Sequence, residues 1–168
     1  NQADYSQALE RFHQSLAYDR ELKDQNGECR TLNNIGLLYR ALRQYEKALE
    51  YLESAYALLK RQGDQFGIAQ CTHNIGLVLA CMNQHRRSLA YFKTSLAYSI
   101  SSEAICHQAY PLSGMCEAWY YLGAMDSAAF TVDQFLGLPQ SCREPKLLAS
   151  FYLLMGKVKF KQNQLVIA

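Results

Sequence analysis

The chain repeats its own sequence at an interval of 40 residues, and this repeat constrains the fold more than any other feature. The tetrapeptide Asn-Ile-Gly-Leu at 34–37 recurs at 74–77, and Asp-Gln-x-Gly at 24–27 recurs at 64–67. The register continues toward both ends of the chain without an insertion. A repeat of this length is one supersecondary unit, which buries its apolar face only by stacking on neighbouring units.

Each unit has the pattern of two helices. In its first half, apolar and small residues follow the i, i+3, i+4, i+7 spacing of one helix face, at Leu32, Ile35, Gly36 and Tyr39. The second half has a similar face that begins at Ala48. Glycine costs about 1 kcal/mol relative to alanine inside a helix, so its recurrence indicates a packing role. We expect Gly36 and Ala48 to lie where two helices cross closely.

The pattern predicts an all-α fold, an α-solenoid of antiparallel helix pairs with about four repeats. We expect helices at about 4–23, 28–42, 44–61, 66–82, 84–100, 104–122, 125–137 and 144–161. The clearest break lies around Pro139. Pro111 falls inside the sixth expected helix, and it should either kink that helix or delay its start.

These residues resemble the tetratricopeptide repeat, whose characteristic positions fall here on Leu32, Ile35, Gly36, Tyr39, Ala48, Leu52 and Ala55. The resemblance covers essentially the whole chain and implies a right-handed superhelix. The period is 40 residues rather than the usual ~34, and the family's proline near the end of each pair is replaced by Lys60, Ile100 and Gln140. In both respects the chain resembles the longer-repeat branch found in kinesin light chain, in the spindle-orientation adaptor built of Leu-Gly-Asn repeats, and in bacterial Rap-type regulators.

We call the first and second helix of each pair helix A and helix B. The register predicts a single array over residues 1–168. It consists of helix B of a truncated first repeat, three complete repeats and a partial fifth repeat, at 1–24, 28–61, 66–100, 104–138 and 144–168.

The charge balance excludes some classes of partner. Lys and Arg number 17 and Asp and Glu number 15, so the formal net charge is +2. A balance this close to zero gives no electrostatic footprint for nucleic acid or an anionic membrane. No apolar run approaches the ~18 residues of a transmembrane helix. We therefore expect no nucleic-acid partner and no membrane insertion.

The chain has six cysteines: Cys29, Cys71, Cys81, Cys106, Cys116 and Cys142. No two have the C-x-x-C spacing of zinc ribbons or redox motifs. Since free cysteine often packs as a small apolar residue, we expect free, mostly buried thiols in a reducing, cytoplasmic compartment. Cys81 and His85 have the spacing of half a metal site, but Cys81 aligns with Ala41 as a packing position. We expect no bound metal and no cofactor.

The sequence contains no Gly-rich phosphate loop, no G-x-S-x-G and no H-E-x-x-H, so we expect no enzymatic activity. The resemblance instead implies a concave groove lined by the A helices. Its expected peptide-binding residues are Arg30, Asn33, Asn34, Leu37 and Arg40 in the second unit, Gln70, His73, Asn74 and Leu77 in the third, and Tyr110, Glu117, Tyr120 and Tyr121 in the fourth.

Asn34 and Asn74 occupy the same position in adjacent units. A carboxamide offers a donor and an acceptor and can pair with both groups of one peptide unit, so these residues would grip the backbone of an extended partner. In the alternative interpretation they cap or orient neighbouring helices. Gly114 holds the position in the fourth unit and would interrupt the series there.

The hypothesis that follows is a non-catalytic scaffold that holds a protein or extended peptide in its groove. The alternative is a sensory or regulatory module of a larger signalling protein, bacterial in one version, that docks an output domain or a signal peptide. Apolar residues on the last expected helix, among them Leu147, Phe151 and Leu154, also predict association between copies through the faces of the terminal repeats.

Overall fold

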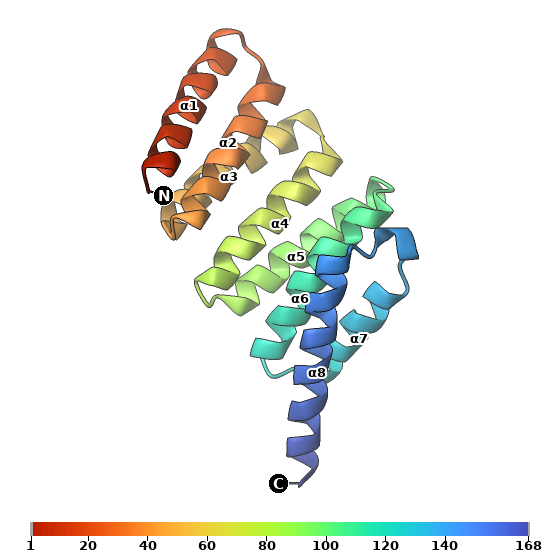
Figure 1. The fold of residues 1–168 in the computed structure, drawn as a ribbon. Coiled ribbons are helices and arrows are strands. Elements are labelled where there is room, and N and C mark those ends of the chain that lie inside the picture. The colour runs from red at the N-terminus through yellow and green to blue at the C-terminus, as the bar shows by residue number, and fades with distance from the viewer. Residues whose placement is uncertain (1, 168) are drawn as a thin grey trace.

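The computed structural model describes residues 2–167, and side chains within residues 4–161 (Figure 1). Throughout the described residues the secondary structure is helical, with no strand, so the all-α prediction is confirmed. The α-helices are α1 (Gln2–Glu21), α2 (Gln25–Ala41), α3 (Tyr45–Gln62), α4 (Gln65–Cys81), α5 (His85–Ser101), α6 (Ala109–Tyr121), α7 (Met125–Leu136) and α8 (Pro145–Ile167). Two short 3-10 helices, η1 (Ile105–Gln108) and η2 (Gln140–Cys142), precede α6 and α8.

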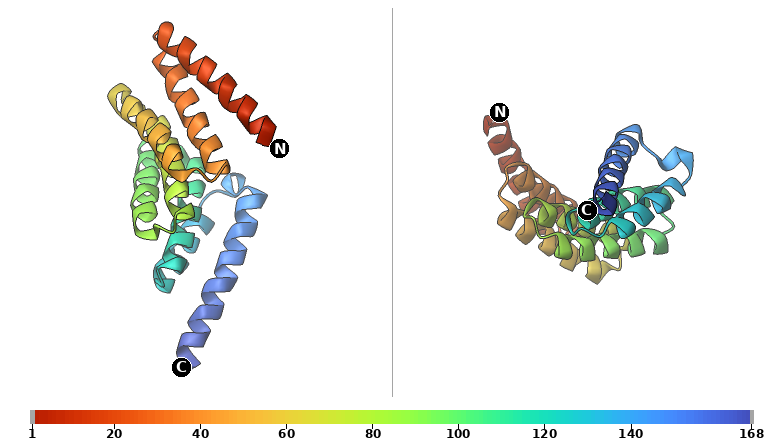
Figure 2. Two further views of the ribbon diagram at one scale, coloured as in Figure 1. Left: turned by 90° about the vertical axis from the view of Figure 1, so that its left-hand side faces the viewer. Right: turned by 90° about the horizontal axis from the view of Figure 1, so that it is seen from below.

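Each helix from α1 to α8 packs against the next one, and the A helices α2, α4, α6 and α8 also contact one another in order. The result is a curved two-layered array, an α-solenoid, in which successive pairs are rotated relative to one another (Figure 2). Helix α1 and helix α8 lie at opposite ends of the array (Figure 1).

Residues in a left-handed conformation follow the ends of the helices at regular intervals of 20 residues. These residues are Lys23, Arg43, Gly63, Asn83, Glu103 and Gly123, with φ between 56° and 79°. After α2, for example, Arg43 N–H donates to the Arg40 carbonyl and Gln44 N–H donates to the Tyr39 carbonyl, the hydrogen bonds of a Schellman cap. Because the interval is constant, helices α2 to α5 have nearly equal lengths and the pairs stack in register.

The repeated Asp-Gln-x-Gly motif starts the A helices α2 and α4. The carboxylates of Asp24 and Asp64 accept hydrogen bonds from the backbone N–H groups of Gly27 and Gly67, at 3.0 and 2.9 Å. Each aspartate is therefore the N-cap of its helix. Helix α2 starts three residues earlier than the sequence predicted, because the cap at Asp24 precedes the first apolar position.

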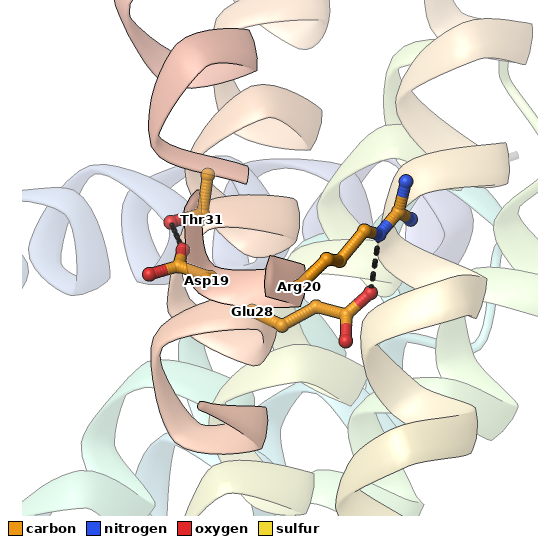
Figure 3. A network of polar contacts seen from close by, with 4 residues as sticks. All are labelled: Asp19, Arg20, Glu28 and Thr31. Atoms are coloured by element: carbon orange, nitrogen blue, oxygen red, sulfur yellow. Dashed lines mark hydrogen bonds and ion pairs between the residues drawn. The ribbon is translucent and has the colours of Figure 1, made fainter. Parts of the chain in front are cut away.

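A polar network joins α1 to α2 (Figure 3). Thr31 Oγ1 donates to Asp19 Oδ2 at 2.7 Å, and Arg20 Nε donates to Glu28 Oε1 at 2.7 Å. The 40-residue register places Leu59 and Cys71, which are both buried, at the positions of Asp19 and Thr31. The junction of α1 with α2 is therefore held by polar contacts, whereas the equivalent positions at the junction of α3 with α4 hold the buried residues Leu59 and Cys71.

The small residues do lie where helices cross closely. A Cβ atom on Gly36 of α2 would come within 2.6 Å of the Leu52 side chain on α3. The Phe92 ring of α5 is enclosed more tightly, since Cβ atoms on Gly76 of α4 and Gly114 of α6 would each lie 2.5 Å from it. Phe92 is 1% exposed, and these contacts place its ring between two A helices.

The structure departs from the predicted boundaries near α6 and α8. Pro111 lies in the first turn of α6, so it delays that helix after the η1 segment and does not kink it. The sequence predicted that the last helix ends at residue 161, but α8 continues to Ile167. Its residue 163 is helical, whereas the register counterparts at 43, 83 and 123 are left-handed and end their helices. Ala168, the register counterpart of Ala48 in a further helix B, lies outside the described residues.

The prediction of six free thiols is wrong for two of them. Cys106 and Cys142 form a disulfide, because η1 and η2 bring their Cα atoms to 4.5 Å, within the range that a bridge requires. Cys29, Cys71 and Cys116 are free and buried as expected, whereas Cys81 is free and exposed. Nothing in the spacing of Cys106 and Cys142, 36 residues apart, marks them as partners.

None of the helices in the described part of the chain combines the length and the apolar character that crossing a membrane requires.

The close approach around Phe92 predicts a steric clash in Gly76→Ala. Alanine favours helix by about 1 kcal/mol, but the added methyl group has no free space, and overpacking typically costs about 1–3 kcal/mol. We expect a lower free energy of unfolding in urea denaturation. In the Phe92→Val background the same substitution should be neutral or stabilising.

Gly156→Ala is the matched control, since no atom lies within 4 Å of its Cβ position. Equal effects at Gly76 and Gly156 would contradict the packing assignment.

Candidate functional site

Two adjoining cavities open on the side of the array formed by the A helices. Cavity I, of about 400 Å³, is lined by Asn33, Leu37, Ala69, Gln70, His73, Asn74, Ser95, Ser99, His107, Tyr110 and Pro111. Cavity II, of about 650 Å³, is lined by Asp24, Asn26, Cys29, Arg30, Asn33, Leu59, Asp64, Phe66, Gly67, Gln70 and Cys71. Asn33 and Gln70 line both, so the two cavities adjoin at these residues.

The structure brings together part of the predicted groove. The predicted residues that line the cavities are Arg30, Asn33, Leu37, Gln70, His73, Asn74 and Tyr110. Those that line neither are Asn34, Arg40, Leu77, Glu117, Tyr120 and Tyr121. Sequence reasoning missed Phe66 and His107, which precede the predicted groove positions, and Ser95 and Ser99, which belong to a B helix.

The carboxamides of Asn33 and Asn74 bond directly to each other across α2 and α4. Asn74 Nδ2 donates to Asn33 Oδ1 at 2.9 Å. Asn34, the register counterpart of Asn74, is exposed and lines neither cavity. The two positions therefore differ in environment, and their joint action on a peptide backbone stays a prediction.

His73 lines cavity I and has a ring nitrogen without a hydrogen-bond partner among the described residues. This atom, Nδ1, is buried. The imidazole lies 5.6 Å from the Phe92 ring and 6.0 Å from the Tyr110 ring, measured between centroids. Burial, and secondarily the charges of Arg40 and His107, lower the pKa of His73 from 6.5 to about 4. The imidazole is therefore neutral near pH 7, with one nitrogen as donor and the other as acceptor.

An aromatic wall closes the end of cavity I next to α6. The His107 ring packs edge-on against Phe66, with centroids 4.6 Å apart, and lies 5.7 Å from the Tyr110 ring. Tyr110 Oη donates to Glu144 Oε1 at 2.7 Å, a hydrogen bond that raises the pKa of the tyrosine. This contact ties the start of α6 to the segment that leads into α8.

The remaining aromatic groove residues are engaged by neighbouring side chains. The ammonium group of Lys161 lies 5.1 Å from the centre of the Tyr120 ring. Tyr121 stacks on His85, with ring centroids 4.6 Å apart and planes at 9°. Leu77 packs against the apolar cluster around Phe92. Within the part of the chain that the structure describes, no three His, Cys, Asp or Glu side chains come together to hold a metal ion.

The fold and the cavities define a helical-repeat protein with two adjoining cavities that its A helices help to line. The family model of the tetratricopeptide repeat matches residues 1–61 and 28–100, more than half of the chain. The chain therefore belongs to the tetratricopeptide repeat family, whose repeats are generally protein-interaction scaffolds and typically non-catalytic.

No curated protein matches the chain. Among solved structures, the crystal structure of BtubC (BKLC) from P. vanneervenii is similar, with a TM-score of 0.83 and 17% sequence identity. The match covers 94% of this chain and 66% of BtubC, so this chain spans just under two thirds of that protein's length. At this identity the likeness concerns the fold alone.

The lowered pKa of His73 predicts how stability depends on pH. In the unfolded chain this imidazole takes up a proton as the pH falls below about 6.5, whereas the folded chain takes it up only near 4. Protons therefore favour unfolding in this window, by up to about 3 kcal/mol at its acidic end. We expect His73→Gln to lose less stability than the wild type between about pH 7 and about pH 4.5, measured by urea denaturation. His13→Gln, at an exposed position on α1, should behave like the wild type. Parallel curves for all three proteins would contradict the assignment.

Proposed function

We propose that the chain is a non-catalytic scaffold that holds an extended segment of a partner protein in the groove formed by cavities I and II. The observation that supports this proposal is that the two cavities adjoin and share Asn33 and Gln70 in their linings. An extended segment advances about 3.3 Å per residue and carries unpaired N–H and C=O groups. Two adjoining cavities offer contacts to several residues of such a segment, whereas one isolated pocket accepts only a single side chain. A cytoplasmic location is part of this proposal.

The groove residues supply the hydrogen bonds that such a backbone needs. The Asn74–Asn33 bond uses one N–H of Asn74 and the oxygen of Asn33, so each carboxamide keeps further capacity. The bond also holds the two side chains in place before a partner arrives, which lowers the entropic cost of binding. Gln70 adds a third carboxamide where the cavities meet.

Peptides selected from a displayed random library on the immobilised chain test this proposal. We expect the Asn33→Ala/Gln70→Ala double variant to bind a selected peptide at least about tenfold more weakly in fluorescence polarisation, because two hydrogen-bonding groups are removed where the cavities meet. The Asn34→Ala/Asn74→Ala variant separately tests the predicted pair of equivalent asparagines.

The matched control is Glu50→Ala, at an exposed position on the B helix α3. It should bind like the wild type. Circular dichroism should show unchanged helix content in every variant. Selection of no peptide, or equal binding by the wild type and both double variants, would refute binding in this groove.

We also propose that copies associate through α8 and α1, but not through Phe151 and Leu154 as the sequence suggested, because both are buried within the array. Gly156 of α8 is the register counterpart of Gly36, yet no atom lies within 4 Å of its Cβ position. Tyr152 is 54% exposed, whereas its counterpart Leu32 is 2% exposed. On α2 this face packs against α3. The equivalent face of α8 is therefore exposed.

Helix α1 has the residues to fill that face. Ala8 and Phe12 stand at the register positions of Ala48 and Leu52, which pack against Gly36. Docking of α1 from a second copy on α8 would therefore continue the array with the helix contact that it already repeats. Such a head-to-tail contact joins two different surfaces, so each copy in a dimer keeps one surface that can bind a further copy.

Complementary blocked variants test this association by multi-angle light scattering. Gly156→Leu fills the notch on α8, and Ala8→Arg blocks the facing surface of α1. Each variant alone should remain a monomer, whereas their mixture should form a one-to-one dimer, because each keeps the surface that the other lacks. Tyr18→Ala, at an exposed site on α1, is the control and should associate like the wild type. A monomeric wild type at high concentration, or a mixture that stays monomeric, would refute the contact.

A further inference from the structure

The disulfide joins the two short segments that flank the last helix pair. Cys106 lies in η1, ahead of α6, and is exposed, whereas Cys142 lies in η2, ahead of α8, and is buried. A small cavity of about 120 Å³ surrounds the bridge, and its lining includes His107, Tyr110 and Glu144. The bridge is therefore surrounded by residues that also shape the groove.

On the α8 side, the bridge fastens the longest connection between two α-helices of the array. Residues 137–144 separate α7 from α8 and contain only the short η2 helix. Noncovalent anchors of this connection are the Arg143 guanidinium, which donates to the carbonyls of Leu136 and Leu138, and Glu144, which accepts from Tyr110. The arginine contacts reach only the connection itself and the last residue of α7, so they do not tie the connection to α6.

On the α6 side, the bridge fastens the wall of cavity I. His107 follows Cys106 directly, lines both cavity I and the small cavity, and packs edge-on against Phe66 of α4. Tyr110, one turn further, lines the same two cavities. The bridge is therefore adjacent, in sequence and in space, to residues that line cavity I.

We propose that Cys106–Cys142 is a thiol–disulfide exchange site, and that its cleavage releases both the connection before α8 and the η1 wall of cavity I. The reactant is a dithiol reductant. One of its thiolates attacks the sulfur of the exposed residue Cys106, the bridge breaks, and Cys142 leaves as a thiolate that takes up a proton. The second thiolate of the reductant then attacks its own sulfur in the mixed disulfide and releases Cys106. Two electrons pass to the protein, the reductant becomes a cyclic disulfide, and two cysteine thiols result.

The other cysteines separate clearly from this site. Burial raises the pKa of Cys71 to about 12 and that of Cys116 to about 11, and it raises the pKa of Cys29 as well. These three groups therefore remain protonated thiols, which are poor nucleophiles. Cys81 is exposed and unbridged, so it serves as a control.

Hydrogen–deuterium exchange with and without dithiothreitol tests the proposal on the intact chain. We expect reduction to speed amide exchange at least about tenfold in residues 104–110 and 137–148, because their closed state loses a covalent link, and to leave residues 25–101 unchanged. The Cys106→Ser/Cys142→Ser variant should exchange at the fast rate in both conditions. Cys81→Ser should respond to dithiothreitol as the wild type does.

Two results would overturn the proposal. One is alkylation of Cys106 and Cys142 in the unreduced protein, detected by mass spectrometry. The other is unchanged exchange in both segments after mass spectrometry confirms reduction. The measurement needs no bound peptide, so it stands or falls separately from the proposed scaffold function.

Discussion

The contact between a glycine on helix A and a large side chain on helix B sets the spacing of the array. Without a Cβ atom at Gly36 and Gly76, Leu52 and Phe92 approach the backbone of the partner helix directly. Phe92 extends this contact to the next pair, because its ring also lies against Gly114. The same ring lies beside His73, which lines cavity I. Packing between the helix pairs and the position of a groove side chain are thus fixed by one residue.

The sequence contained the helices and their register, because apolar periodicity and the 40-residue repeat are local patterns. The sequence did not predict the left-handed residues that end the helices. Of the six turn residues, Lys23, Arg43 and Glu103 are types that avoid this conformation, at a cost of about 1–2 kcal/mol. Their position is imposed by the two helices that meet there. The Cys106–Cys142 bridge was equally hidden, since it depends on two 3-10 segments that the repeat pattern does not predict.

The candidate site was predictable where it belongs to the middle of an A helix. Asn33, Gln70 and His73 were found because one register places them on one face. The register does not predict which side chains of different helices contact one another. It aligned Asn34 with Asn74, but the crossing of α2 and α4 pairs Asn74 with Asn33. It also omitted His107, because the delay of α6 by Pro111 turns the preceding residues into a separate 3-10 segment.

The chemistry of the two cavities differs in a way that bears on recognition. The lining of cavity I contains three carboxamides, two imidazoles and three hydroxyl groups, and no Asp, Glu, Lys or Arg. In cavity II the carboxylates of Asp24 and Asp64 already accept hydrogen bonds as helix caps, so their first role is structural. Hydrogen bonds depend on direction more strongly than ion pairs do, and salt screens them less. If the proposed scaffold function is right, a segment that crosses both cavities would therefore be selected mainly by the path of its backbone and the shape of its side chains, with Arg30 in cavity II as a charged contact.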